Sequence, residues 1–307
     1  YLRADRDEGQ RAGVANLLHV AGSKAIAEVL PNVGDSAELV VVLKLCTAVD
    51  VGVVFGNLAR EELRVDVLGA GHAAKSIGEL FSQPDTCVAG FNSLRFDDEF
   101  IRYGFYRMLM DPYAREWQNG NSRWDLIDVL RLTRALRPQG IEWPHHDDGS
   151  PSFRLEQLTV ANGIGHEHAH DALSDVRATI GMARLLRQRQ PRLYDYVYRM
   201  RDKRRVAELL DAGRPLVHAS SRYPAKFCGT ALVQPLAPDP NNPQGTLVYD
   251  LRQDPAQFMD LDSEALAARI FTRSEELSEG QQRLPVKSVR RNRCPVLAPM
   301  KTLDAAA

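Results

Sequence analysis

The sequence has 307 residues, of which 44% are hydrophobic and 26% charged, with a formal net charge of −1. This length suffices for two domains with separate cores, and the composition is ordinary for a soluble globular protein. Four scattered cysteines without a C-x-x-C motif argue against a disulfide framework or a zinc site. No apolar run approaches the ~20 residues of a membrane span, and no signal-peptide pattern is present. We therefore expect a cytoplasmic protein without membrane contact.

The basic residues are concentrated in two stretches. Residues 184–205 hold nine Lys or Arg against two Asp, and Arg290, Arg291 and Arg293 form a second cluster. Basic stretches on a nearly neutral chain favour one surface that binds a polyanion. A solvated helix surface is the alternative interpretation.

The first 74 residues carry the weakest signals. Residues 14–30 have a pattern compatible with a helix, although Gly22 weakens it. Residues 39–46 and 51–55 are apolar runs typical of short buried strands. None of these predicted strands carries an Asp-x-Glu pair.

From residue 77 the pattern becomes clearer. It predicts a short helix over 77–82, a buried strand over 86–92 and then a helix that continues to Met108. Asp97 stands where the strand passes into the helix, the position at which open α/β folds collect functional groups. Ordinary acidic residues in a first helical turn are the alternative.

Aromatic and basic residues alternate around the next segment. Tyr113 and Trp117 are interleaved with Arg102, Arg115 and Arg131. Aromatic faces stack bases and guanidinium groups hold phosphates, so this pattern favours single-stranded nucleic acid. For Trp117 the sequence leaves core packing and base stacking equally open.

Residues 137–152 form a loop rich in Pro and Gly, followed by a predicted helix over 152–165 with Ser152 as its N-cap. Arg154 falls in its first turn, where it either reaches a phosphate or forms an exposed ion pair.

The longest helical pattern begins after His170 and carries Asp175 one turn in. A histidine that accepts a proton from water, beside a carboxylate that holds a divalent cation, is half of a metal-dependent phosphodiesterase site. The spacing of His170 and Asp175 is common in proteins. The alternative interpretation is an ordinary helix start with an Asp in its first turn. Pro191 ends the pattern and marks a predicted domain boundary. Short strands with Pro and Gly turns after Gly213 predict a small barrel or sandwich.

Several long motifs carry a family resemblance: FNSLRFDDEF, DPYAREWQNGNSRWDL, ALRPQGIEWP, DDGSPSFRLEQLTVANGI, HDALSDVRATI and RQPRLYDY. They resemble bacterial exodeoxyribonuclease I, a member of the 3′→5′ exonuclease superfamily named for four acidic residues, and PLVH, LVYDL and LPVKSVRRNRCPVLAP continue the match. The resemblance implies an α/β fold: a ribonuclease H-like exonuclease domain, incomplete at its N-terminal part, over 75–190, and a truncated SH3-like β domain over 191–307. Residues 1–74 remain unassigned, and our hypothesis is an aberrant, misread or frame-shifted N-terminus.

The resemblance also implies a function: a monomeric, Mg²⁺-dependent enzyme with two metal ions that degrades single-stranded DNA in repair and recombination. Asp97 and Asp175 correspond to metal-holding carboxylates and His170 to the general base. Residues matching the DNA path are Arg154, Arg102, Tyr113, Trp117, Arg131 and Tyr196. Arg137 and Tyr196 match positions that dock the tail of single-stranded DNA-binding protein.

One departure matters. The first motif of the family, a strand with Asp-x-Glu near the N-terminus, has no counterpart in residues 1–74. Three alternatives therefore stay open: a catalytically impaired single-stranded DNA-binding fragment, an RNA-directed exonuclease of the same superfamily, and a fragment without a stable fold.

Overall fold

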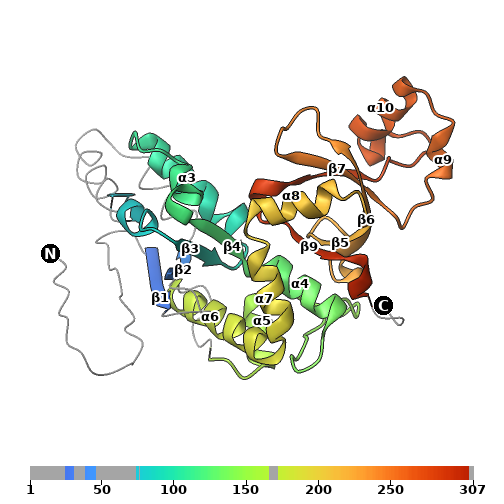
Figure 1. Cartoon of the computed structure of the whole chain (residues 1–307). Coiled ribbons are helices and arrows are strands. Elements are labelled where there is room, and N and C mark those ends of the chain that lie inside the picture. Colours follow the sequence, from blue (N-terminus) through green and yellow to red (C-terminus); the bar gives the residue numbers. More distant parts are fainter. Residues whose placement is uncertain (1–24, 31–38, 46–73, 76, 166–171, 304–307) are drawn as a thin grey trace, which may run out of the picture.

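Two β-sheets and the helices around them make up the described part of the chain (Figure 1). The computed structural model describes residues 25–30, 39–45, 74–75, 77–165 and 172–303. Its strands are β1 (Ala25–Leu30), β2 (Leu39–Leu45), β3 (Thr86–Gly90), β4 (Ser122–Asp125), β5 (Leu216–Ala219), β6 (Thr230–Pro238), β7 (Gly245–Asp250), β8 (Val286–Arg290) and β9 (Val296–Pro299). Its α-helices are α3 (Asp97–Arg107), α4 (Leu126–Leu136), α5 (Leu155–Ala161), α6 (Ala172–Arg189), α7 (Pro191–Arg199), α8 (Lys203–Asp211), α9 (Ala256–Met259) and α10 (Ser263–Phe271).

The first sheet has the order β1-β2-β3-β4. Strands β2, β3 and β4 are parallel, and β1 pairs antiparallel with β2. Every residue of β3 is buried, as expected for a central strand with helices on both faces. Val88 packs in a cluster with Ile101 and Phe105 of α3, whereas Cys87 and Ala89 belong to the cluster that contains α4 and α6. Because successive side chains of a strand point to opposite faces, α3 and α6 lie on opposite faces of the sheet.

The strand predicted over 39–46 is confirmed by β2. The helix predicted over 14–30 is wrong for its last part, because residues 25–30 form β1 and pair with β2. The sheet partner outweighs a weak helical pattern here. Residues 14–24 and the strand predicted over 51–55 lie outside the described residues.

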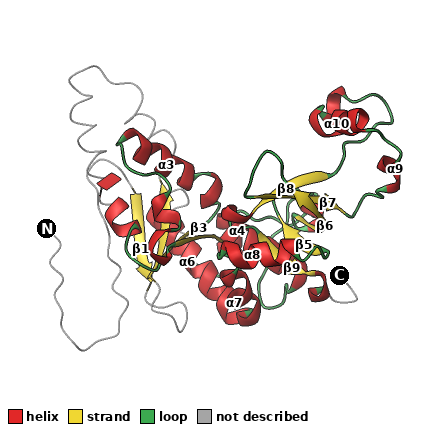
Figure 2. Cartoon of the chain, turned by 45° about the horizontal axis from the view of Figure 1, so that its top comes forward, coloured by secondary structure: helices red, strands yellow, loops and turns green. Residues whose placement is uncertain are grey.

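Helix α4 joins the two halves of the molecule (Figure 2). Asp125, the last residue of β4, caps α4 by accepting a hydrogen bond from the backbone N–H of Ile127 at 3.1 Å. Leu130 and Leu132 of α4 are fully buried in a core cluster that also contains Val217 and Val296 of the second sheet. The apolar core is therefore continuous across the two sheets.

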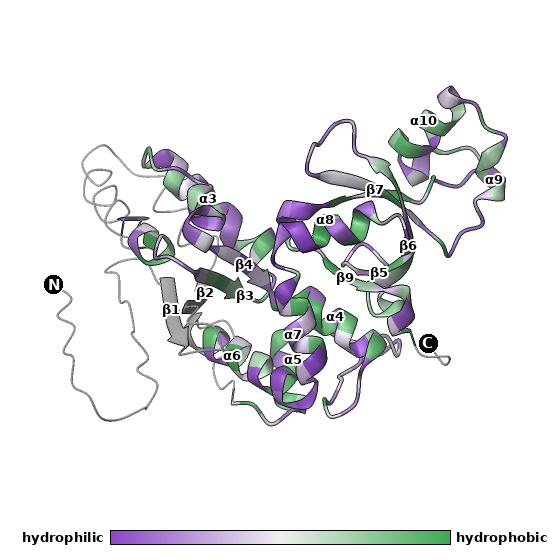
Figure 3. Ribbon diagram, in the orientation of Figure 1, coloured by the Kyte–Doolittle hydropathy of each residue, from purple (hydrophilic) through white to green (hydrophobic). Residues whose placement is uncertain are grey.

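Helices carry both hydrophobic and hydrophilic residues in Figure 3, as expected when one face of a helix is buried.

The second sheet is antiparallel and has the order β8-β7-β6-β5-β9. The short strands predicted after Gly213 are confirmed by β5 to β8, and β9 was not anticipated. Helix α10 has no buried residue, and with α9 it projects away from the sheet (Figure 1). The first half is α/β with a mostly parallel sheet and the second is built on an antiparallel sheet, which agrees with the expected fold class.

No helix within the described ranges is both long enough and apolar enough to span a membrane.

Candidate nucleic-acid interface

Asp97 is the first residue of α3, and only 2% of the residue is exposed. Between β3 and α3 the chain turns through Asn92, whose φ of 61° is in the left-handed region that Asn tolerates better than most residues. A short 3-10 helix, η1 (Ser93–Arg95), follows. The predicted position of Asp97, at the carboxyl end of a buried strand, is the position found.

Asp125 fixes this turn from the neighbouring strand. Its carboxylate accepts hydrogen bonds from the backbone N–H groups of Asn92 at 2.8 Å and Leu94 at 3.1 Å, in addition to Ile127. Burial, with a smaller contribution from Asp128, raises the pKa of Asp125 to about 6, against the opposing effect of the three N–H groups. The end of β4 therefore holds the segment that leads into Asp97.

The second predicted carboxylate, Asp175, lies in the first turn of α6 and is 7% exposed. Within the described segments, no group of three or more His, Cys, Asp or Glu side chains is placed to share a metal ion. The predicted base His170 lies outside the described residues.

Strand β2 (LVVVLKL) is the parallel neighbour of β3 and contains no acidic residue. A two-metal site has ions ~4 Å apart and needs several carboxylates to offset their charge. The described residues contribute Asp97 and Asp175, and these two do not by themselves fit such a centre.

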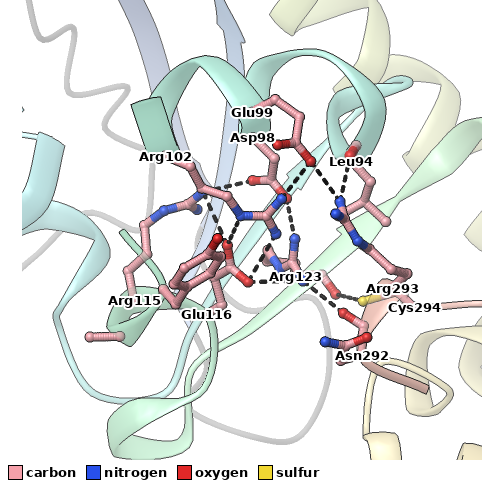
Figure 4. A network of polar contacts seen from close by, with 12 residues as sticks. Leu94, Asp98, Glu99, Arg102, Arg115, Glu116, Arg123, Asn292, Arg293 and Cys294 are labelled. Atoms are coloured by element: carbon pink, nitrogen blue, oxygen red, sulfur yellow. Dashed lines mark hydrogen bonds and ion pairs between the residues drawn. The ribbon is translucent and has the colours of Figure 1, made fainter. Parts of the chain in front are cut away.

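Directly after Asp97 lies a cluster of ionised side chains, called here the ion cluster (Figure 4). Its members come from α3, from the segment before β4 and from β4 itself: Asp98, Glu99, Arg102, Arg115, Glu116 and Arg123.

Asp98 lies between two buried guanidinium groups. Nη2 of Arg115 donates to Oδ1 of Asp98 at 2.9 Å, and Arg123 donates to the other oxygen. Burial pushes the pKa of Asp98 up, but Arg123 and Arg115 outweigh it and hold the pKa below its usual value. Asp98 is therefore the charged partner that lets two arginines be buried.

Glu116 binds Arg102 and Arg123. Nε of Arg102 lies 2.7 Å from Oε1 of Glu116, and Nη2 of Arg123 lies 3.0 Å from Oε2. Arg102 also donates to Glu99 at 2.7 Å, and only 6% of the residue is exposed. Its guanidinium is thus engaged by two carboxylates, and its predicted contact with DNA remains a prediction.

The ion cluster reaches the second sheet through the segment that follows β8. Nη2 of Arg123 donates to the backbone oxygen of Asn292 at 2.8 Å. The thiol of Cys294 donates to the backbone oxygen of Arg123 at 3.1 Å. Nη1 of Arg293 donates to Glu99 at 2.8 Å (Figure 4). The start of α3 is therefore attached to both halves of the molecule.

A groove of about 760 Å³ opens beside the ion cluster. Its lining combines two aromatic residues with seven basic ones, together with a few polar groups: Tyr113, Trp117, Arg123, Arg199, Arg201, Lys203, Arg204, Arg205, Arg291, Glu116, Gln244 and Asn292. The two basic stretches of the sequence meet here, as expected for one polyanion-binding surface.

Two predicted DNA-path residues line this groove. Tyr113 is 56% and Trp117 59% exposed, so Trp117 is not part of the core. The guanidinium carbon of Arg102 lies 5.4 Å from the centre of the Tyr113 ring. Exposed aromatic rings amid cations suit base stacking.

Other predicted contacts lie outside the groove lining. Arg131 forms a salt bridge with Asp128 and lies over the ring of Phe153, 5.6 Å from its centre. Arg154 is exposed and is the N-cap residue of α5. The helix predicted to start at Ser152 therefore starts later, and the Ser152 hydroxyl instead accepts from the backbone N–H of Arg154 at 3.3 Å.

The two predicted partner-binding residues are on neighbouring helices. Arg137 follows the last residue of α4 and donates to the backbone oxygen of Leu136. Tyr196 lies on α7, and burial raises its pKa to about 12. Within the described chain its buried hydroxyl has no hydrogen-bond partner.

Sequence reasoning missed Arg123, Glu116 and Gln244. Arg123 lies on a strand and Gln244 in a turn, so no local charge pattern marks either of them. Only the tertiary fold brings them to the groove.

Comparison with known proteins completes the description. Residues 63–183 match the family model "Exonuclease", and residues 201–307 match "Exonuclease I SH3-like domain". The chain is 47% identical over 253 residues to exodeoxyribonuclease I of Escherichia coli (strain K12), covering 82% of this chain and 53% of the relative. The chain spans about half the length of the curated relatives it matches.

Solved structures agree. An exonuclease I from Methylocaldum szegediense is 53% identical, with a TM-score of 0.74 over 77% of this chain and 51% of that one. The zinc-bound form of an E. coli exonuclease I–single-stranded DNA complex is 46% identical, with a TM-score of 0.73 over 77% and 51%. An exonuclease I/SSB-Ct complex is 47% identical, with a TM-score of 0.72 over 77% and 51%. By its sequence over most of its length and by the fold of both its halves, the chain belongs to the exodeoxyribonuclease I family.

Proposed function

We propose that the chain is part of a 3′→5′ exonuclease that hydrolyses single-stranded DNA to 5′-mononucleotides during repair and recombination. The observation that carries the proposal is the groove in which Tyr113 and Trp117 lie among basic side chains. Because the chain covers 53% of its E. coli relative, the activity proposed is that of the whole protein. A cytoplasmic location and a monomeric state are part of the same proposal.

The groove residues bind the strand in two ways. Arginine and lysine side chains hold the phosphates, which makes binding weaken with salt. The rings of Tyr113 and Trp117 stack on bases, which requires unpaired bases and therefore favours a single strand over a duplex. Stacking and phosphate contact together hold the strand without reading its sequence.

The chemical step belongs to the acidic site. In the proposal Asp97 and Asp175 would contribute to holding Mg²⁺, His170 would take a proton from the attacking water, and Arg154 would contact the substrate phosphate. The family resemblance implies two ions, and a zinc-bound relative supports a divalent metal. The described residues provide only two carboxylates of that site.

A protein partner is also proposed. Arg137 and Tyr196 are assigned to docking the tail of single-stranded DNA-binding protein; Arg137 directly follows α4, and Tyr196 lies on the neighbouring helix α7. The complex of an exonuclease I with SSB-Ct supports this assignment.

A second candidate function is single-stranded DNA binding without cleavage. The specific observation in its favour is β2, which pairs in parallel with β3 and carries no carboxylate. A weak metal site beside an intact groove would bind strands but not cut them.

The test is incubation of a 5′-labelled single-stranded DNA oligomer with the 307-residue chain and Mg²⁺. A ladder of shortened products supports the exonuclease, and binding without shortening supports the second candidate. An RNA oligomer of the same sequence excludes or reveals an RNA-directed enzyme. If the chain cleaves, His170→Ala is expected to keep DNA binding and lose most turnover, and full activity of this variant would refute the role of His170.

A further inference from the structure

A second hollow lies at the junction of the two halves, between η1, the start of α4 and strands β5 and β8. Its volume is about 280 Å³, just below the range of ~300–1,000 Å³ that is usual for ligand sites. It is distinct from the large groove, although Cys294 borders both. A hollow of this size takes a small group and not a folded partner.

The lining of this hollow is strongly basic. Five cationic side chains border it, from η1, from the turn after β5 and from β8 and its continuation: Arg95, Arg222, Lys287, Arg290 and Arg293. Two carboxylates, Asp125 and Asp128, face them. The excess of positive charge calls for an anion.

The salt bridges leave part of this charge without a partner. Arg95 binds Asp128 at 2.7 Å, and Arg293 binds Glu99 at 2.8 Å. In the described part of the chain, no carboxylate lies within 4 Å of the charged groups of Lys287 or Arg222.

Lys287 is partly buried, whereas Arg95, Arg222 and Arg290 are exposed. Burial, together with Arg222 and Arg95, lowers the pKa of Lys287 to about 8 against the opposing effect of Asp128. Its Nζ lies 4.8 Å from the centre of the Tyr223 ring. The Tyr223 hydroxyl is hydrogen-bonded to Nδ1 of the buried His218 at 2.9 Å, so the wall behind Lys287 is fixed. An anion in the hollow would therefore stabilise the charged form of Lys287.

We propose that this hollow is a binding site for a phosphoryl group, held by Lys287 and Arg222 with Arg95 at its rim. Phosphate oxygens form short charge-assisted hydrogen bonds with guanidinium and ammonium groups, and a small basic hollow suits their size and charge. Arg95 stands two residues before Asp97, which places the site beside the start of α3. The inference goes beyond the proposed function, because it assigns a separate anion site that needs no cleavage.

The test is a titration of the full 307-residue chain with inorganic phosphate at constant ionic strength. Isothermal titration calorimetry measures binding, and thermal melting measures stabilisation. We expect saturable binding that raises the melting temperature, and at least tenfold weaker binding by Lys287→Met. Lys226→Met is the matched control, because the Nζ of this exposed lysine also lies over an aromatic ring, 5.0 Å from the centre of Phe227, but outside the hollow. It is expected to bind phosphate as the parent chain does.

Equal phosphate binding by Lys287→Met and the parent chain would overturn the proposal. If Lys287→Met fails to fold by circular dichroism, the exposed Arg222→Gln replaces it, with at least threefold weaker binding expected and unchanged binding contradicting the site.

The source of the phosphoryl group is decided by two further arms. A deoxythymidine 5′-monophosphate titration reports a released mononucleotide, and an oligo(dT) titration reports a phosphodiester of the bound strand. Weaker oligo(dT) binding by Lys287→Met assigns the site to the strand, and an effect on the mononucleotide alone assigns it to the product. Phosphate binding at Lys287 in a chain that binds no DNA would support this site while refuting the proposed function.

Discussion

Nη1 of Arg293 lies 2.8 Å from Oε1 of Glu99, although 194 positions separate the two residues in the sequence. This salt bridge joins the segment after β8 to the helix that begins with Asp97. Both side chains are more than a third exposed, so the pair is screened by water and contributes little to stability. The neighbouring pairs of Asp98 are buried, and they carry the larger energetic effect.

Asp98→Asn is expected to lower the free energy of unfolding by about 3–5 kcal/mol, because it leaves the buried Arg115 and Arg123 without their carboxylate. Urea denaturation of the parent and variant chains measures the difference. Asp147→Asn, at an exposed loop position, is the control and should change stability by less than about 0.5 kcal/mol. A loss below about 1 kcal/mol for Asp98→Asn would contradict the role of this carboxylate.

Trp117→Ala should weaken the binding of single-stranded DNA by about 1–3 kcal/mol, or roughly 5- to 150-fold, because an exposed stacking ring is removed. The fold should be unaffected, since the side chain is not in the core. Trp124 provides the matched comparison: it is 4% exposed, and Trp124→Ala should lower the melting temperature markedly. Fluorescence anisotropy with labelled oligo(dT) gives the affinity. An affinity of Trp117→Ala equal to that of the parent chain would remove this residue from the strand path.

Asp125 should make stability depend on pH in an unusual direction. Its pKa rises from 3.8 to about 6 on folding, so the folded chain binds the extra proton. This stabilisation is complete below pH 4 and is lost as the pH rises through about 6. The pKa difference of about two units corresponds to about 3 kcal/mol in the free energy of unfolding. Asp98 and Glu99, whose pKa values are lowered, act in the opposite direction, since their contribution is lost as the pH falls below 4.

The measurement is the unfolding free energy between pH 4 and 7 for the parent chain and Asp125→Asn. The variant should be less stable throughout, because an amide N–H₂ would face one of the backbone N–H groups of Asn92, Leu94 and Ile127. It should also lose the decline between pH 4 and 6. Parallel curves for the two proteins would assign that decline to another group.

The sequence predicts much of the fold because its strongest patterns are local. The buried strand before Asp97, the long helix with Asp175 and the strands after Gly213 each carry a hydrophobic pattern of their own that marks them without knowledge of their partners. Residues 25–30 were mispredicted because a strand depends on its sheet neighbour. The ion cluster could not be foreseen, because spacing does not reveal that Glu99 meets Arg293 or that Arg123 reaches the backbone of Asn292.

The last prediction concerns the missing carboxylates. In β2, Val42 is the register partner of Ala89, which packs in the same cluster as Val176 and Ala178 of α6, the helix that carries Asp175. The double variant Val42→Asp/Lys44→Glu introduces the Asp-x-Glu spacing at this register. It should bind Mg²⁺ more tightly than the parent chain and, if the remaining residues are competent, shorten single-stranded DNA.

Val41→Asp/Leu43→Glu/Lys44→Gln is the matched control. It has the same spacing and the same change in net charge, because Lys44 is lost in both variants, but its carboxylates are shifted by one residue, to the register of Val88, which packs against α3. Mg²⁺-dependent thermal stabilisation measures binding in both variants. Tighter binding in the first variant alone would mean that the strand beside β3 is the place of the first motif. Equal responses in the two variants would show that added negative charge, and not position, attracts the ion.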